Sequence, residues 1–275
     1  RNLTGAAAGF KSGEASLLAL DASLGIDGLP QSATGQTSIF TGCNAPAYLG
    51  RHLNGFPDQR LRKLLATRGI FRQLKKRNYK AFFANAYRPP FFDLLRRGLP
   101  GDYYSCSTLI TYYGRLKFNS LDELVDGKAL YMDVTNEILR RMGYDLPAIT
   151  PESAAERLLR LSRAYDFTLF EYFLSDLAGH MSDKDEAVKV ISVIDQFIGR
   201  LVELLNPQDE LLIVTSDHGN LEDLSTGDHT TNPVPLLLAG NRLMRERVCN
   251  SARNITDIAP SLLRSLAGKD DENAN

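Results

Sequence analysis

The sequence lacks any apolar run long enough to cross a membrane, because none approaches the ~18 residues that a spanning helix requires. It also has too few cysteines for a disulfide framework: Cys43, Cys106 and Cys249 are odd in number and unevenly spaced. The same scarcity argues against a thiolate metal site and favours a reducing compartment, so we expect a cytoplasmic protein. No segment has the features of a signal peptide.

An excess of charge is also missing, since 32 lysines and arginines face 33 aspartates and glutamates. We therefore expect neither a nucleic acid nor a membrane surface as a partner. Apolar residues, in contrast, are plentiful: 43% of the 275 residues are hydrophobic, enough to bury the core of one large domain. The composition gives no indication of the oligomeric state.

Short apolar runs alternate with amphipathic stretches, which is typical of an α/β fold. We predict a doubly wound, mostly parallel sheet flanked by helices, formed by residues 1–87 and 148–275. The expected strands are Ser16–Leu20, Lys80–Ala84, Phe167–Phe173, Glu210–Thr215 and Val234–Leu238. The expected helices are Asp58–Thr67, Ile70–Arg77, Pro151–Arg163, Lys184–Leu205 and Asp257–Leu266.

Residues 88–147 lack this regular alternation. They contain Pro89-Pro90, Pro100-Gly101 and two Tyr-Tyr pairs, and their short segments have no clean period. We predict a small cap or irregular insertion over one end of the sheet.

Three of the four histidines lie between positions 180 and 229, and each has an aspartate nearby. The segments are Asp176-Leu-Ala-Gly-His180, Asp217-His218-Gly-Asn220 and Asp228-His229-Thr-Thr-Asn232-Pro233. Imidazole and carboxylate are ligands that first-row divalent metals accept. Two of the segments directly follow predicted strands, and ligands bind at the carboxyl ends of strands in open α/β sheets. The pattern therefore predicts a metal site, although a single histidine of this kind is more often structural.

A second feature is the stretch Gly28-Leu-Pro-Gln-Ser32-Ala-Thr34-Gly-Gln-Thr-Ser-Ile-Phe-Thr-Gly42, a loop rich in hydroxyl residues that leads into a short apolar helix. A hydroxyl at a helix amino terminus is well placed for phosphate chemistry, because free N–H groups stabilise an anion there. A divalent metal could lower the pKa of the hydroxyl and make it a nucleophile. Taken alone, the stretch also fits an ordinary capped turn.

Together these features resemble the alkaline phosphatase superfamily, and most of all its branch of cofactor-independent phosphoglycerate mutases and phosphopentomutases. The resemblance covers residues 29–44 and most of 165–240, and Ser216-Asp-His-Gly-Asn220 followed by His229-Thr-Thr-Asn-Pro-Val-Pro235 is its most specific part. It implies two divalent metal ions, Mn²⁺ or Zn²⁺, and a small phosphorylated substrate.

The resemblance also assigns roles to individual residues. Asp176, His180 and His229 take the ligand positions of one metal. Asp217 and His218 take those of the second, to which the nucleophile would also bind. Ser32 takes the nucleophile position, with Thr34 as the alternative. Asn44 and Asn232 are expected to line the phosphate pocket.

Two departures from the family shape the functional hypothesis. The family begins with an apolar strand ending in an aspartate that completes the second metal site; none precedes Ser16, and Asp21 does not match it. We expect this strand to lie upstream of Arg1; the alternative is a defective second metal site. The region between Ser32 and Asp176 is also short, which favours hydrolysis over mutase action. We therefore expect a metal-dependent phosphatase-like hydrolase; the alternatives are a phosphomutase of the phosphoglycerate mutase type and a non-catalytic metal-binding descendant.

Overall fold

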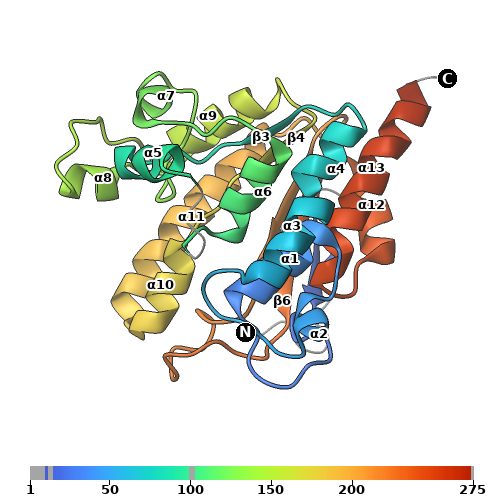
Figure 1. The fold of residues 1–275 in the computed structure, drawn as a ribbon. Helices are drawn as coiled ribbons and strands as arrows, with labels where there is room; N and C mark the ends of the chain where they lie inside the picture. The colour runs from blue at the N-terminus through green and yellow to red at the C-terminus, as the bar shows by residue number, and fades with distance from the viewer. Residues whose placement is uncertain (1–9, 12–14, 99–102, 274–275) are drawn as a thin grey trace.

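The computed structural model describes residues 10–11, 15–98 and 103–273, and it has a mixed α/β fold (Figure 1). Each strand that the sequence predicts is present within a few residues of its expected bounds. The strands are β1 (Phe10–Lys11), β2 (Ala15–Leu20), β3 (Ala81–Phe83), β4 (Phe167–Leu169), β5 (Leu211–Thr215) and β6 (Val234–Gly240).

Helices account for most of the remaining elements. Those of the first half are α1 (Ser32–Thr41), α2 (Ala45–Leu49), α3 (Gln59–Arg68), α4 (Ile70–Lys76), α5 (Pro89–Arg96), α6 (Cys106–Gly114), α7 (Leu121–Val125) and α8 (Glu137–Arg141). Those of the second half are α9 (Pro151–Ser162), α10 (Leu174–Met181), α11 (Lys184–Leu204), α12 (Arg242–Ser251), the 3₁₀ turn η2 (Ile255–Asp257) and α13 (Ile258–Asn273). In the part of the chain that the structure describes, no helix is long and apolar enough to cross a membrane.

The strands form a four-stranded sheet in the order β1-β2-β6-β5 and a separate pair, β3-β4. Only β3 and β4 are parallel; each neighbouring pair in the larger sheet is antiparallel. The prediction of a mostly parallel sheet is therefore wrong for this sheet. The reason is that residues 216–233 form no helix, and a parallel return from β5 to β6 would need a helical crossover.

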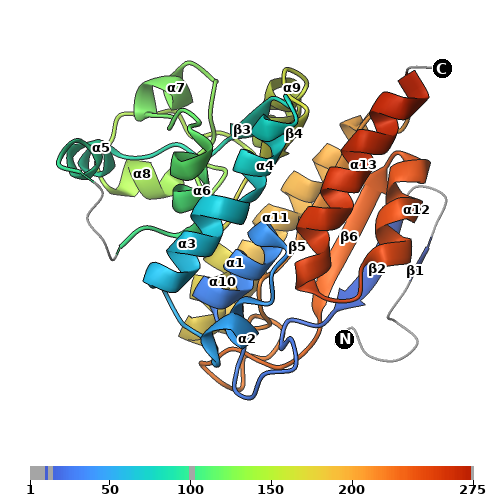
Figure 2. The ribbon, with the colours of Figure 1, turned by 45° about the vertical axis from the view of Figure 1, so that its right-hand side comes forward.

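Apolar side chains cover both faces of the strands. Adjacent residues of β3 point in opposite directions, so Phe83 packs in a cluster with α1, α4, α6 and α13, whereas Phe82 packs in another with α9 and α11. Figure 2 shows α4 and α13 in front of the strands and α11 behind them. Helix α11 buries Val190, Phe197 and Leu201, which lie on one face at helical spacing, whereas Val188 and Ile191 are exposed.

The predicted cap region, residues 88–147, divides into two parts by its packing. Cys106, Leu109 and Ile110 of α6 belong to the same buried cluster as α3 and α4. Residues 121–146 instead have a small cluster of their own, around Leu124, Tyr131 and Leu139. The boundary between core and cap stays a prediction, but the packing of α6 is continuous with the main core.

Candidate metal centre

Helix α10 carries the first two predicted ligands on one face. Asp176 and His180 are four residues apart, which places their side chains one turn apart on the same side of the helix. The Asp176 Oδ1 and His180 Nε2 atoms are 3.4 Å apart, and both side chains remain about 40% exposed. The helix therefore presents a carboxylate and an imidazole together at the open side of the site.

The loop after β5 supplies the other predicted ligands. Asp217 and His218 directly follow the strand, and an antiparallel bridge between Gly219 and Thr230 brings the returning chain alongside them. His229 consequently stacks on His218, with 3.6 Å between ring centroids and 16° between the planes. Both imidazoles are almost fully buried.

Backbone carbonyls fix the orientation of two of the imidazoles. The Nδ1 of His229 lies 2.8 Å from the carbonyl oxygen of Pro30, and the Nδ1 of His180 lies 2.7 Å from that of Gly227. Because a carbonyl can only accept, each Nδ1 carries the proton and each Nε2 presents its lone pair. The two Nε2 atoms face each other 3.2 Å apart, an arrangement that a cation between them would stabilise.

Asp176 is the carboxylate on which the imidazoles converge. Its Oδ1 lies 3.4 Å from His229 Nε2 and 3.8 Å from His218 Nε2, in addition to the contact with His180. Burial alone would raise the pKa of Asp176, but the interaction with His229 and the three neighbouring imidazoles hold it below its ordinary value. Burial alone would lower the pKa of His229, but Asp176 and the Pro30 carbonyl raise it above its ordinary value.

The donor set fits a divalent metal. One ligand atom from each of Asp176, His180 and His229 lies within 4.8 Å of the others, which is the one such group of three acidic, histidine or cysteine residues in the described part of the chain. Asp176 Oδ1 is buried without a hydrogen-bond partner. A buried carboxylate oxygen among imidazole lone pairs is a combination that a bound cation satisfies.

Ser32 is the first residue of α1, and it lies against the buried imidazole of His218. Its Oγ is 2.9 Å from His218 Nε2, which in turn is 3.6 Å from Asp217 Oδ2. Burial lowers the pKa of His218, although Asp217 opposes the shift, so a neutral ring is favoured. The structure thus brings Ser32, Asp217 and His218 together beside the first set of ligands.

Thr34, the alternative nucleophile, is fully buried. Its hydroxyl donates to the carbonyl of Gln31 at 3.0 Å and accepts from the N–H of Leu53 at 3.3 Å. Both bonds hold the hydroxyl in the packing of α1, whereas Ser32 Oγ opens onto the cavity that Asp176 and Asp217 also line. The local geometry therefore favours Ser32 as the reactive hydroxyl.

Comparison of the sequence with known protein families gives one family that matches this chain. A sequence model of the metalloenzyme superfamily matches residues 132–270, half of the chain. The chain belongs to the metalloenzyme superfamily. The matched segment contains five of the predicted metal ligands but not Ser32.

Several similar relatives of the superfamily are 2,3-bisphosphoglycerate-independent phosphoglycerate mutases. The protein from Antithamnion sp. is 31% identical over 135 residues, which are 45% of this chain and 26% of that protein. The protein from Yersinia pestis is 35% identical over 130 residues, 44% of this chain and 25% of that protein. The chain thus spans about a quarter of the length of the curated relatives it matches.

Solved structures give a weaker likeness. Leishmania mexicana phosphoglycerate mutase has a TM-score of 0.43 and 16% identity, and the match covers 73% of this chain and 37% of that one. A protein from Pyrococcus horikoshii has a TM-score of 0.45 and 15% identity, with 70% of this chain and 51% of that one covered.

Of the two asparagines that are expected to line the phosphate pocket, one lies at the cavity beside Ser32 and the other does not. Asn232 lines the same cavity as Ser32, and its amide donates to Glu222 Oε1 at 3.1 Å. Asn44 instead caps α2, accepting from the N–H of Ala47 at 3.0 Å and donating to the carbonyl of Leu24 at 2.9 Å. It is not among the residues that line the cavity, so its contact with phosphate stays a prediction.

Two acidic residues at the site escaped the sequence interpretation. Glu222 holds the loop that carries His229, because it accepts from the N–H of Asn220 at 2.7 Å and from the Thr230 hydroxyl. Glu171 lines the cavity and accepts from the Ser107 hydroxyl, while burial raises its pKa to about 7. Neither has a sequence signal beyond its nearness to the histidine segments.

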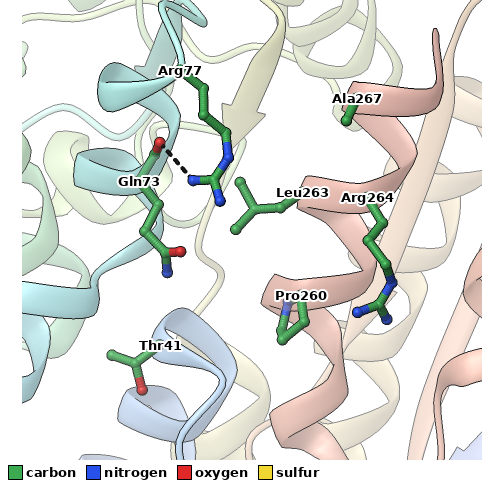
Figure 3. Close-up of a pocket in the computed structure, with 7 residues that line it drawn as sticks. All are labelled: Thr41, Gln73, Arg77, Pro260, Leu263, Arg264 and Ala267. Atoms are coloured by element: carbon green, nitrogen blue, oxygen red, sulfur yellow. Dashed lines mark hydrogen bonds between the residues drawn. The ribbon is translucent and has the colours of Figure 1, made fainter. Parts of the chain in front are cut away.

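A smaller cavity of about 360 Å³ lies between α4 and α13 (Figure 3). Arg77 and Arg264 line it together with Gln73 and Leu263, and the Arg77 guanidinium donates to the Gln73 carbonyl at 3.1 Å. The cavity shares no lining residue with the metal centre, so it does not extend that site.

Proposed function

We propose that the protein is a metal-dependent phosphoryl-transfer enzyme of the phosphomutase type, acting on a small phosphorylated substrate. The observation that carries the proposal is the convergence of three imidazoles on Asp176 beside a hydroxyl at the amino terminus of a helix. The sequence alone favours hydrolysis, because the region between Ser32 and Asp176 that holds the predicted cap is short. The names of the similar relatives favour a mutase instead.

The donor groups divide into two proposed sites. Asp176, His180 and His229 would hold one metal ion, and Asp217, His218 and Ser32 would bind the second. When bound, Mn²⁺ or Zn²⁺ would supply positive charge for the transferred phosphoryl group and lower the pKa of the Ser32 hydroxyl. Second-sphere bonds from the carbonyls of Pro30 and Gly227 keep the two imidazoles aimed at the first site.

Ser32 is the proposed nucleophile. Its oxygen would form a bond to phosphorus as the bond between phosphorus and the substrate oxygen breaks, leaving phospho-Ser32 and a free hydroxyl on the substrate. Free N–H groups in the first turn of α1 would stabilise the phosphate charge. Return of the phosphoryl group to a different substrate oxygen completes a mutase cycle; transfer to water would make the enzyme a phosphatase.

Metal analysis and a pair of histidine variants test the metal sites. Reconstituted protein should bind Mn²⁺ or Zn²⁺, and His229→Ala should remove most of the metal from one site. His52→Ala is the matched control, since His52 contacts the carbonyl of Ile26 at 3.2 Å and lies outside the ligand group. Less than half an equivalent of metal in the unmodified protein would contradict the proposed function.

Product analysis with 2- and 3-phosphoglycerate and other phosphomonoesters tests the reaction. Ser32→Ala should lower turnover by several orders of magnitude, as expected when a covalent step is lost, with metal at the first site retained. Interconversion of phosphoglycerate isomers supports the mutase, and release of free phosphate alone supports the phosphatase. Metal binding without turnover of any ester would indicate the non-catalytic descendant.

A further inference from the structure

The cavity onto which Ser32 opens has a volume of about 1440 Å³, and the charged side chains that line it are mostly carboxylates. Among the residues that the structure describes, Arg163 contributes the one guanidinium or ammonium group of this lining. Arg163 precedes β4 and donates to Glu210 at 2.8 Å, so it is already paired, at the end of the cavity opposite the metal centre. A negatively charged leaving group at Ser32 would therefore meet neither a lysine nor an arginine of this lining.

Glu171 is a carboxylate of the same cavity that the proposed mechanism does not use. Asn85 fixes its backbone, because the Asn85 amide donates to the Glu171 carbonyl at 2.8 Å and the Asn85 side-chain oxygen accepts from the Glu171 N–H at 3.0 Å. The Ser107 hydroxyl donates to the Glu171 carboxylate, and the Gln36 side chain forms a second hydrogen bond to it. The carboxylate is thus held in one position by uncharged groups.

These uncharged groups leave the negative charge of Glu171 without a positive counterpart. Loss of hydration and the charge of Asp217 raise its pKa to about 7, and no cation in the described part of the chain offsets them. Buried charges in proteins are normally paired or coordinate a metal. Glu171 does not belong to the group of ligand atoms that lie close enough to share a metal ion. A cation brought by a ligand would therefore stabilise this carboxylate.

Gln36 connects Glu171 to the proposed nucleophile. Ser32 and Gln36 are four residues apart in α1, so both side chains lie on one face of the helix. One helical turn separates them by ~6 Å, which is roughly the length of a two- or three-carbon chain. An ester held by its phosphate at Ser32 could therefore place a cationic group beside Glu171.

An aromatic pair borders the mouth of the cavity. Phe56 lines the cavity and is 45% exposed, and Tyr103 packs edge-on against it with 5.9 Å between ring centroids. Aromatic ring faces attract cations that lie within about 6 Å of the ring centre. The mouth thus offers aromatic surface to a cationic ligand, in addition to the carboxylate deeper in the cavity.

We propose that the substrate is a phosphate ester of a short amino alcohol, whose ammonium group binds Glu171 and lies under Phe56. The inference rests on the proposed function, since it names the class of ester that the Ser32 site takes. Glu171 would contact the substrate and determine its specificity without touching the reacting atoms. Phosphoglycerate would be a poor ligand, because its carboxylate would face Glu171 instead of a cation.

Binding of three matched esters tests the proposal independently of turnover. The Mn²⁺-loaded Ser32→Ala protein is titrated by calorimetry with phosphoethanolamine, with propyl phosphate, in which a methyl group replaces the ammonium, and with 3-phosphoglycerate. The titrations are made at pH 8, where Glu171 is ionised. We expect phosphoethanolamine to bind about 10- to 100-fold more tightly than propyl phosphate, as one charge-assisted hydrogen bond implies, and 3-phosphoglycerate to bind least tightly.

A pair of variants assigns the preference to Glu171. In the Ser32→Ala background, Glu171→Gln keeps the size of the side chain and removes its charge, so the affinity ratio of phosphoethanolamine to propyl phosphate should fall to about 1. Asp209→Asn is the matched control, because Asp209 lines the same cavity but precedes β5, at the end away from Ser32. It should keep the ratio of the parent protein.

Two results would overturn the proposal while leaving the proposed function intact. The first is binding of propyl phosphate or 3-phosphoglycerate as tightly as phosphoethanolamine. The second is an affinity ratio that Glu171→Gln leaves as high as Asp209→Asn does, which would place the ammonium group elsewhere. If none of the three esters binds the metal-loaded protein, the proposed function itself fails, and the inference fails with it.

Discussion

Replacement of Gly35 by alanine tests how closely α1 must approach the metal centre. A Cβ at this position would lie 2.5 Å from the carbonyl oxygen of Asp217 and 3.0 Å from its Cβ. The first contact is with backbone, which cannot rotate away, so α1 or the loop after β5 must shift. Either movement would separate Ser32 from His218 and Asp217.

The magnitude follows from two opposing effects. Crowding a packed position costs about 1–3 kcal/mol. Alanine is favoured over glycine in a helix interior by ~0.5–1 kcal/mol, so the net loss for Gly35→Ala is roughly 0–2.5 kcal/mol. Gly199 is the matched control, because it is also helical and a Cβ there would meet nothing within 4 Å. Gly199→Ala should gain the propensity term alone.

Thermal unfolding of the two variants isolates the steric cost. The propensity gain cancels between them, which leaves a difference of ~1–3 kcal/mol, or roughly 2–12 °C in Tm for a chain of this size. Gly35→Ala should also lose metal and phosphoryl transfer, whereas Gly199→Ala should keep both. If the two variants show equal Tm values and equal metal content, the close packing of α1 on Asp217 is not what positions Ser32.

Two further substitutions probe the acidic residues that the sequence did not reveal. Glu222→Ala should cost only about 1 kcal/mol of unfolding free energy, since solvent screens this exposed carboxylate. It should nonetheless weaken metal binding by releasing the His229 loop; unchanged affinity by calorimetry would argue against that role. Burial raises the pKa of Glu171 to about 7, so the folded chain retains a proton that the unfolded chain releases. Stability should therefore fall as pH rises from its ordinary pKa to about 7, by up to ~3 kcal/mol. Glu171→Gln should remove this slope in denaturation midpoints measured across that range, and an unaltered slope would show that Glu171 ionises normally.

Local signals in the sequence were enough to place most elements. Helix α9 begins at Pro151, as the sequence predicts, and the Thr150 hydroxyl before it accepts from the N–H of Ser153 at 3.1 Å. Helix α11 has nearly the predicted bounds, and it buries one face through Val190, Phe197 and Leu201. These features depend on residues a few positions apart, so the sequence determines them without knowledge of the fold. The candidate ligand residues could be named for a similar reason, because each follows a recognisable strand or lies in a short specific motif.

The direction of the strands could not be predicted in this way. The prediction of a mostly parallel sheet assumed a helical crossover between each pair of strands. Residues 216–233 connect β5 to β6 without a helix, and this loop carries the buried His218 and His229. The geometry of the site thus depends on the same antiparallel return that made the sheet prediction wrong.

Only the tertiary structure decided how the metal centre is assembled. The sequence predicts His229 as a ligand, but its orientation comes from the carbonyl of Pro30, which is 199 residues away. It named both Ser32 and Thr34 as candidates, and only the structure shows that Thr34 is buried against Leu53. Each of these features depends on where distant backbone segments meet, and no local pattern of residues specifies such a meeting.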